Sequence, residues 1–317
     1  MLDRGSVAGL ASELALALRA EVLPLLGSHE GRAHVGEARG GEGGGDVTFA
    51  IDERAESFLE SFLAERAPEV AFYSEDRGMV TPEGEAEWVL IVDPIDGTRP
   101  AMAGFESACV SVAVARLDSE PRMGDVEVGC IAEIKSGALY RAGRGGGIDP
   151  PPSLSANTDP SRMFWSYGLR GRPVRAMAEV LGELIDASSV GGATFDLGSA
   201  TFDMTRVASG QLDAYVEPGP RIVADVPGML EQFEQVGGGA ILNNSPHDIA
   251  AAALCLREAG AVVTDAYGKP LDGRPLLGSG PEFQISCVAA ANPDLHRAIC
   301  EAIDAGIRRL ADGGKIA

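Results

Sequence analysis

The sequence is poor in basic residues. Its 317 residues include 26 Lys and Arg against 47 Asp and Glu, which gives a formal net charge of −21 at pH 7. Nucleic acids and anionic membranes are polyanions that select for Lys and Arg, so we expect neither as a partner. If the substrate of so acidic a protein is itself an anion, cations must bridge the two, and this requirement points toward a metal.

Cysteine motifs and long apolar runs are also missing. The N-terminus has no basic segment followed by an apolar run, and no stretch approaches ~18 consecutive apolar residues. The cysteines are odd in number and form no Cys-x-x-Cys pair, which argues against a disulfide framework and against a zinc knuckle. We therefore expect reduced, buried thiols and a cytoplasmic location. The cysteines are Cys109, Cys130, Cys255, Cys287 and Cys300.

Helical and strand-like patterns alternate along the chain, which favours a layered α/β or α+β architecture. A single core rarely supports a chain of this length, so we expect two lobes, residues 1–150 and residues 151–317, divided at a triple proline. The glycine-rich residues 32–46 predict a mobile surface loop. The patterns predict helices over 10–25, 52–63, 174–184, 199–209, 248–259 and 293–310, and strands over 88–92, 109–115, 129–134, 138–141, 163–167, 212–216, 261–264 and 284–288.

A rigid acidic turn, Asp-Pro-Ile-Asp-Gly-Thr, follows the apolar run 88–92. That run is short and continuous, which is typical of a buried strand. Mg²⁺ is usually held by a few carboxylates together with waters and substrate phosphate. Because the proline stiffens the turn, Asp93 and Asp96 can face one ion. Gly97 permits close approach of a ligand, and Thr98 offers a hydroxyl and a backbone N–H to phosphate oxygens.

The hexapeptide at 93–98 reproduces a signature of the inositol monophosphatase family, which this chain resembles, whereas an Asp-Pro dipeptide alone is typical of an ordinary turn. Upstream, residues 73–76 are similar to the family's acidic pair, and residues 46–52 resemble its Thr-x-x-Asp element. Downstream, residues 247–252 resemble its second signature, with His247 in place of Trp; we assign His247 no role in proton transfer. The resemblance runs from the first helix to the last, and it implies a layered α-β-α-β-α sandwich assembled as a homodimer.

The resemblance also implies an activity, hydrolysis of inositol monophosphate or a similar small phosphorylated sugar by a metal-activated water. The implied cofactor is Mg²⁺, two to three ions per chain, and lithium would inhibit. Five site carboxylates bring a charge of −5 and three Mg²⁺ bring +6, so a phosphate dianion can bind without a lysine. The implied metal ligands are Glu75, Asp93, the Ile95 carbonyl, Asp96 and Asp248.

Further residues take their roles from the same resemblance. Thr98 and Asp52 would orient the attacking water and accept its proton, so the implied catalytic residues are Thr98, Asp52, Glu75 and Asp93. The implied substrate contacts are Gly97, Thr98, Gly198, Ser199, Ala200 and Glu217.

The segment between Glu217 and Asp248 is longer than the family pattern, and we expect it to govern substrate choice. Asp225 within it competes with Asp248 for the role of last metal ligand. We favour Asp248, because an alanine-rich helical pattern that stops near Gly260 follows it directly.

Two other functions remain open. The first is a related enzyme of the same superfamily, a fructose-1,6-bisphosphatase or a 3′(2′),5′-bisphosphate nucleotidase. The second is a catalytically silent metal-binding homologue, which need not retain all of Glu75, Asp93, Asp96, Thr98 and Asp248. A dinucleotide-binding dehydrogenase is disfavoured, because the triple glycines lack a strand-glycine-helix frame.

Overall fold

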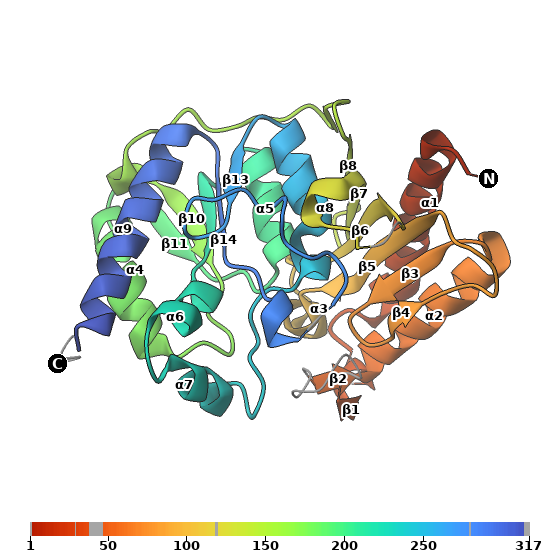
Figure 1. Ribbon diagram of the computed structural model, residues 1–317, viewed down its shortest axis with the longest axis horizontal. Coiled ribbons are helices and arrows are strands. Elements are labelled where there is room, and N and C mark those ends of the chain that lie inside the picture. The colour runs from red at the N-terminus through yellow and green to blue at the C-terminus, as the bar shows by residue number, and fades with distance from the viewer. Residues whose placement is uncertain (1, 29, 38–46, 118–119, 279, 314–317) are drawn as a thin grey trace.

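Helices and sheets are stacked as α-β-α-β-α in the computed structural model, which describes residues 2–28, 30–37, 47–117, 120–278 and 280–313 (Figure 1). This stacking confirms the sandwich predicted from the sequence. The helices are α1 (Arg4–Val22), α2 (Ala50–Arg66), α3 (Thr98–Ala103), α4 (Val174–Ser188), α5 (Ala200–Ala208), α6 (Gly219–Asp225), α7 (Met229–Val236), α8 (Pro246–Glu258) and α9 (Pro293–Ala311).

The strands form two large sheets and one small one. The seven-stranded sheet has the order β4-β3-β5-β6-β7-β8-β9, and its strands are β3 (Ala71–Ser74), β4 (Gly78–Val80), β5 (Trp88–Asp96), β6 (Cys109–Arg116), β7 (Val126–Glu133), β8 (Leu139–Gly143) and β9 (Ile148–Asp149). The five-stranded sheet has the order β11-β10-β12-β14-β13, with β10 (Phe164–Tyr167), β11 (Ala193–Phe195), β12 (Ala214–Glu217), β13 (Val262–Thr264) and β14 (Cys287–Ala290). The small sheet pairs β1 (His34–Glu37) with β2 (Val47–Phe49).

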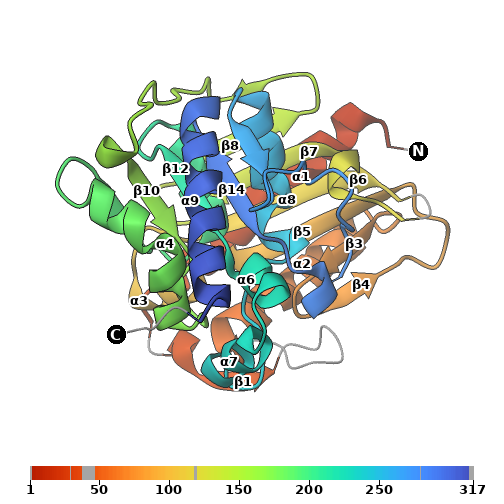
Figure 2. The same ribbon diagram turned by 60° about the vertical axis from the view of Figure 1, so that its left-hand side comes forward.

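Each sheet is covered on both faces. Helices α1 and α2 pack on one face of the seven-stranded sheet, and α5 and α8 lie between the two sheets. Helices α4 and α9 cover the outer face of the five-stranded sheet, where Figure 2 shows α9 in front of β14. Both faces of strand β5 are buried. Val89 and Ile91 face the core shared with α8, whereas Leu90 and Val92 face α1 and α2. A strand buried on both faces reads as a continuous apolar run.

Helix α8 approaches the seven-stranded sheet unusually closely. The alanines at 250–253 are all buried, and a Cβ on Gly129 of β7 would lie 2.6 Å from the Ala251 carbonyl oxygen. Small side chains on both partners therefore permit the contact. Since α8 follows residue 150 in the chain but packs on strands that precede it, the apolar core is continuous across the predicted boundary, and the division into two lobes stays a prediction.

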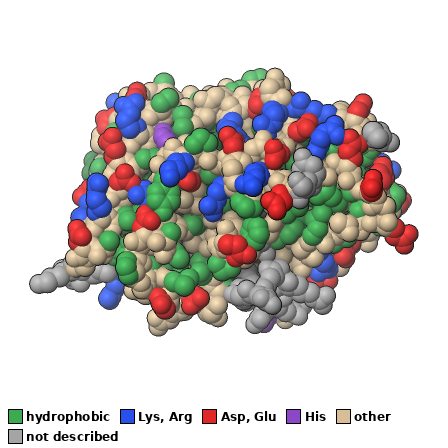
Figure 3. Space-filling view, viewed as in Figure 1, with side chains coloured by type: hydrophobic (Ala, Val, Ile, Leu, Met, Phe, Trp, Pro, Cys, Tyr) green, Lys and Arg blue, Asp and Glu red, His purple; other side chains and the backbone are tan. Residues whose placement is uncertain are grey.

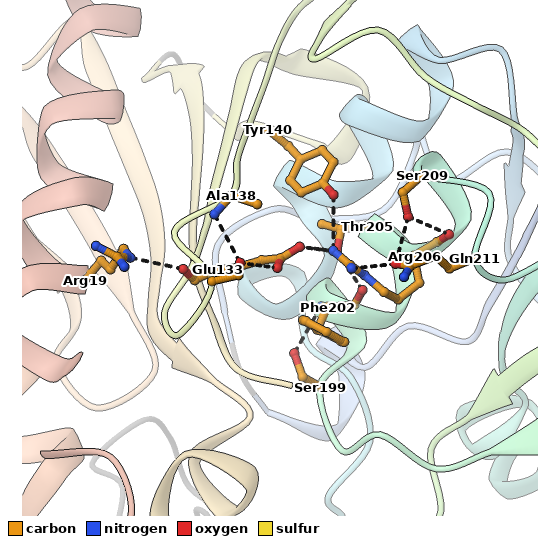
Figure 4. Close-up of polar contacts among 11 residues, drawn as sticks. Arg19, Glu133, Ala138, Tyr140, Ser199, Phe202, Thr205, Arg206, Ser209 and Gln211 are labelled. Atoms are coloured by element: carbon orange, nitrogen blue, oxygen red, sulfur yellow. Dashed lines mark hydrogen bonds and ion pairs between the residues drawn. The ribbon is translucent and has the colours of Figure 1, made fainter. Parts of the chain in front are cut away.

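A buried ion pair joins the first sheet to the central helix layer (Figure 4). Glu133 at the end of β7 pairs with Arg206 of α5, which also donates to the Tyr140 hydroxyl at 3.1 Å. The Glu133 backbone carbonyl accepts from Arg19 of α1 at 3.2 Å. With Glu133 only 3% exposed, truncation of Arg206 would leave a buried, uncompensated carboxylate.

Two local predictions were wrong. The loop predicted over 32–46 contains β1, which pairs antiparallel with β2; backbone ladders form wherever the fold brings two extended segments together, whatever their glycine content. Residues 38–46 lie outside the described residues. The strand predicted over 284–288 begins instead at Cys287, because Gln284 and Ile285 bond to Asn243 and Asn244 rather than to a neighbouring strand.

Candidate active site

Three carboxylates from two elements lie together. Asp93 and Asp96 end β5, Asp248 lies in the first turn of α8, and one oxygen of each lies within 4.8 Å of the others. The pairing of β5 with β6 is irregular between Asp93 and Asp96, so the two side chains escape the strict alternation of a strand. The Ile95 N–H donates to Asp93 Oδ1 at 2.9 Å, which fixes the turn between them.

The start of α5 bonds to the carboxylate of Asp96 and to the backbone of Asp248. Ser199, the N-cap of α5, donates its hydroxyl to Asp96 Oδ2 at 2.8 Å, and the Thr201 N–H donates to the same oxygen. The Thr201 hydroxyl donates to the Asp248 carbonyl at 2.6 Å. Asp248 itself accepts the Ser245 N–H in a capping box at the start of α8. Both acidic elements are therefore anchored to one helix end.

Thr98 and Asp52 form a pair beside this cluster. Thr98 begins α3, and its Oγ1 lies 2.9 Å from Asp52 Oδ1 and 3.2 Å from the Ile95 carbonyl oxygen. Asp52, in the first turn of α2, also accepts the Phe49 N–H at 3.0 Å. Gly97 between the two acidic elements has φ +95°, and a Cβ there would lie 2.5 Å from the Ser107 carbonyl oxygen. Only glycine satisfies both constraints.

Burial governs the electrostatics of the site. It raises the pKa of Asp96 and of Asp52 to about 7, although hydrogen bonds to both oppose the shift. Asp93 has a pKa well above its ordinary range, through burial first and then through Asp96, Asp248 and Glu75. A cluster of oxygen donors that is costly to ionise on its own fits a hard divalent cation, whose charge offsets this cost.

A cleft next to the cluster contains the remaining acidic residue predicted to bind metal. Glu75 follows β3, and Asp93, Ile95 and Thr98 line the same cleft. The structure thus brings together all the predicted metal ligands and the Thr98–Asp52 pair. The full lining is Thr48, Asp52, Glu56, Glu75, Asp76, Asp93, Pro94, Ile95, Thr98 and Arg99.

The predicted substrate contacts that remain lie on two different elements, the start of α5 and the end of β12. Gly198 has φ +80°, and Ser199 and Ala200 follow it at the buried start of α5. Glu217 at the end of β12 is fully buried; it pairs with Arg172 and accepts the Gly219 N–H at 2.8 Å. Arg172 was not identified from the sequence, because its partner lies 45 residues away.

The inserted aspartate and the unusual histidine have structural partners. Asp225 accepts the Tyr267 hydroxyl at 2.7 Å and pairs with Arg221 at 3.2 Å, and it lies outside the carboxylate cluster. His247 is 3% exposed, and its ring stacks on Tyr73 with the centroids 6.3 Å apart. This position fits a packing substitute for a larger aromatic ring.

Comparison with known proteins identifies the family to which the chain belongs. A model of the inositol monophosphatase family matches residues 10–308. The chain belongs to the inositol monophosphatase family. Members of this family hydrolyse phosphate monoesters.

Individual family members are similar over most of their length. A fructose-1,6-bisphosphatase/inositol-1-monophosphatase of Methanothermobacter thermautotrophicus is 28% identical over 308 residues, which cover 93% of this chain and 96% of that protein. An inositol-1-monophosphatase of Mesorhizobium japonicum is 28% identical over 270 residues, 83% of this chain and 84% of that protein. The solved inositol monophosphatase of Anabaena matches with TM-score 0.65 and 20% identity, covering 95% of this chain and 96% of that one; this likeness shows the fold.

A buried glutamate on α2 clamps the family's acidic pair. Glu56 is 2% exposed; its Oε2 accepts the Ser74 hydroxyl at 2.7 Å, and its Oε1 accepts the Asp76 N–H at 3.3 Å. The two carboxylate oxygens of Glu56 therefore accept hydrogen bonds from the residues on either side of Glu75. Glu56 was not predicted from the sequence, although it stands one helical turn after Asp52, where a charged residue interrupts an apolar stripe.

Glu56→Ala should weaken cation binding at Glu75. Partners that orient a metal ligand typically change metal affinity 10–100-fold, so we expect the Mg²⁺ concentration for half-maximal activity to rise by about tenfold or more, with Glu56→Gln intermediate. Calorimetric Mg²⁺ titration measures the same change without turnover. Glu65→Ala, at an exposed position of α2 two turns further along, is the control. A lower melting temperature with unchanged Mg²⁺ affinity would show that Glu56 is only structural.

Stability without metal should fall as pH rises. Because burial raises the pKa of Asp96, Asp52 and Glu56 to about 7, the folded state holds extra protons, and their stabilising effect is lost as pH passes about 7. In chelator, we expect the melting temperature to be roughly 5 °C lower at pH 8 than at pH 5.5. Mg²⁺ should raise it more at pH 8. An equal effect of Mg²⁺ at both pH values would contradict this.

Proposed function

We propose that this chain is a Mg²⁺-dependent phosphomonoesterase that acts on inositol monophosphate or a similar small sugar phosphate. The observation that carries the proposal is the cluster of Asp93, Asp96 and Asp248 next to the Thr98–Asp52 pair. Oxygen donors alone, without Cys or His, favour Mg²⁺ over transition metals. Membership of the inositol monophosphatase family supports the same reaction type.

Five groups would hold two to three ions: the carboxylates of Glu75, Asp93, Asp96 and Asp248 and the Ile95 carbonyl. When bound, the ions would offset the carboxylate charge, bind the phosphate dianion and lower the pKa of water. The Asp52 carboxylate accepts the Thr98 hydroxyl proton, so the lone pairs of Thr98 Oγ1 remain available to accept a proton from the attacking water. In the metal-free chain, burial raises the pKa of Asp52 to about 7, which favours uptake of that proton.

Substrate binding would depend on the backbone as much as on side chains. Gly97 and Thr98 would donate backbone N–H groups to phosphate oxygens at the turn before α3. Gly198, Ser199 and Ala200 would add contacts from the start of α5, where Ser199 bonds to Asp96. Glu217 would act through the Arg172 pair that fixes it rather than as a free carboxylate.

Phosphate release is the direct test. With Mg²⁺, we expect turnover of inositol monophosphate, with activity falling at least about 10²-fold in excess chelator and declining with added lithium. A panel including fructose 1,6-bisphosphate and 3′-phosphoadenosine 5′-phosphate separates the two related enzymes. Undiminished turnover in excess chelator would overturn the metal requirement, and no turnover of any phosphomonoester would favour the silent homologue.

Assembly and location complete the proposal. We infer a homodimer and a cytoplasmic location from the family resemblance and the sequence composition. Among the residues that the structure describes, no helix is long and apolar enough to cross a membrane. Sedimentation velocity of the full chain at micromolar concentration tests the dimer, since a monomer would have about half the mass expected.

A further inference from the structure

A second pocket lies between the insertion and the segment that leads to β14. It offers about 180 Å³ of space and is partly open to solvent, which is comparable to a cavity that holds one benzene-sized ring. It shares no lining residue with the cleft that contains Glu75 and Asp93. Its lining is Pro220, Arg221, Val223, Leu230, Ile241, Asp265, Tyr267, Arg274, Pro281, Gln284, Ile285 and Ser286. We propose that this pocket binds a small organic anion with an apolar, ring-sized body.

Two exposed apolar side chains of the lining can contact the ring of such a ligand. Leu230 and Tyr267 are each 42% exposed, so a ligand between them would remove apolar surface from water. Tyr267 is held rigidly, because the Arg221 guanidinium lies 4.3 Å from its ring centroid and its hydroxyl donates to Asp225. A wall fixed in advance lowers the entropic cost of binding. Seen from the side of Figure 1, apolar side chains are exposed over α6 and α7 among charged ones (Figure 3).

Among the described residues, Arg274 is the basic residue of the lining whose charge no carboxylate offsets. The charge of Arg221 is offset by Asp225 and Asp304. Asp265 uses Oδ1 to accept the N–H groups of Tyr267 and Lys269 in a turn. Arg274 donates from Nη2 to the Gln284 carbonyl at 2.7 Å, and no carboxylate in the described parts of the chain pairs with it. Its guanidinium can therefore bind a carboxylate, sulfonate or phosphate.

The pocket wall is bonded to the segment that carries Asp248. Gln284 donates to the Ile241 carbonyl at 2.6 Å and accepts from Asn243 at 3.0 Å, while the Ile285 N–H donates to the Asn244 carbonyl at 2.8 Å. Asn244 directly precedes the capping box that holds Asp248. Occupancy of the pocket would act on residues 241–245 through these bonds and thereby change cation affinity at Asp248. This coupling rests on the proposed function, whereas binding itself does not.

Two matched single-ring probes, titrated by calorimetry, test the pocket on the full-length protein. Benzenesulfonate and neutral benzenesulfonamide share the ring body, and only the first carries a negative charge. We expect one saturable site that prefers the sulfonate. Arg274→Gln should weaken the sulfonate probe by about tenfold and leave the neutral probe unchanged, and Leu230→Asp should weaken both. Val236→Asp, on the exposed face of α7 outside the lining, is the control.

Several results would overturn the inference. They are no saturable binding to the wild type, equal sulfonate binding by Arg274→Gln, or competitive displacement of the probe by Mg²⁺ with inorganic phosphate, which would place it in the active site. Calorimetric Mg²⁺ titration with and without the saturating sulfonate probe tests the coupling, and an unchanged Mg²⁺ affinity would disprove it. These measurements need no turnover, so failure of the proposed phosphatase activity would be recognised separately.

Discussion

Asp93→Asn is expected to reduce turnover by at least about 10²-fold while the protein stays folded. Asp93 lies within 4.8 Å of both Asp96 and Asp248, and we propose that it would hold Mg²⁺ together with them and offset the charge of the bound metal. The amide retains the size of the carboxylate and the bond from the Ile95 N–H, but it removes the charge. Steady-state kcat at saturating Mg²⁺ measures the loss.

The stability of the same variant provides an internal control. The pKa of Asp93 is raised well above its ordinary range by burial and by neighbouring carboxylates, so its ionised form is unfavourable in the metal-free fold. Metal-free Asp93→Asn should therefore melt at the same temperature as the wild type or higher at pH 8. Near-normal turnover would show that the charge of Asp93 is not needed to hold the metal, and a large drop in melting temperature would show that the loss comes from misfolding.

Asp248→Asn should cost far more activity than Asp225→Asn. Asp248 is part of the cluster, and its charge lies in the first turn of α8, where the helix dipole favours a carboxylate. We expect about 10²-fold lower activity at low Mg²⁺, partly restored as Mg²⁺ is raised. Asp225 already pairs with Arg221 and Tyr267, so its replacement should change activity by about twofold at most.

Mg²⁺ activation curves of the two variants, measured side by side, decide between the aspartates. Each substitution removes one carboxylate charge and preserves side-chain volume, so the variants control for each other. A large loss in Asp225→Asn with little change in Asp248→Asn would reverse the assignment of the last metal ligand.

Local sequence identified those elements whose signal is complete within a short window. Helix α8 and the start of strand β5 were predicted near their observed bounds, because an alanine-rich pattern and an apolar run do not depend on distant partners. The end of β5 was predicted wrongly at residue 92, because the strand continues through the acidic residues to Asp96. Helix α3 was missed, since its six residues contain a proline and are too short to show periodicity. Helices α6 and α7 were missed within the insertion, where their short lengths hide the pattern.

The sequence by itself determined which oxygen donors the chain offers and to which family it belongs, because both follow from the acidic hexapeptide and the other acidic elements. The tertiary structure decided how those donors are held. Only folding places Ser199 against Asp96, 103 residues away, and Glu56 against both neighbours of Glu75. It also decided that Glu217 is paired with Arg172 and that the insertion encloses a second pocket. Such contacts join residues distant in the chain, and no local pattern encodes them.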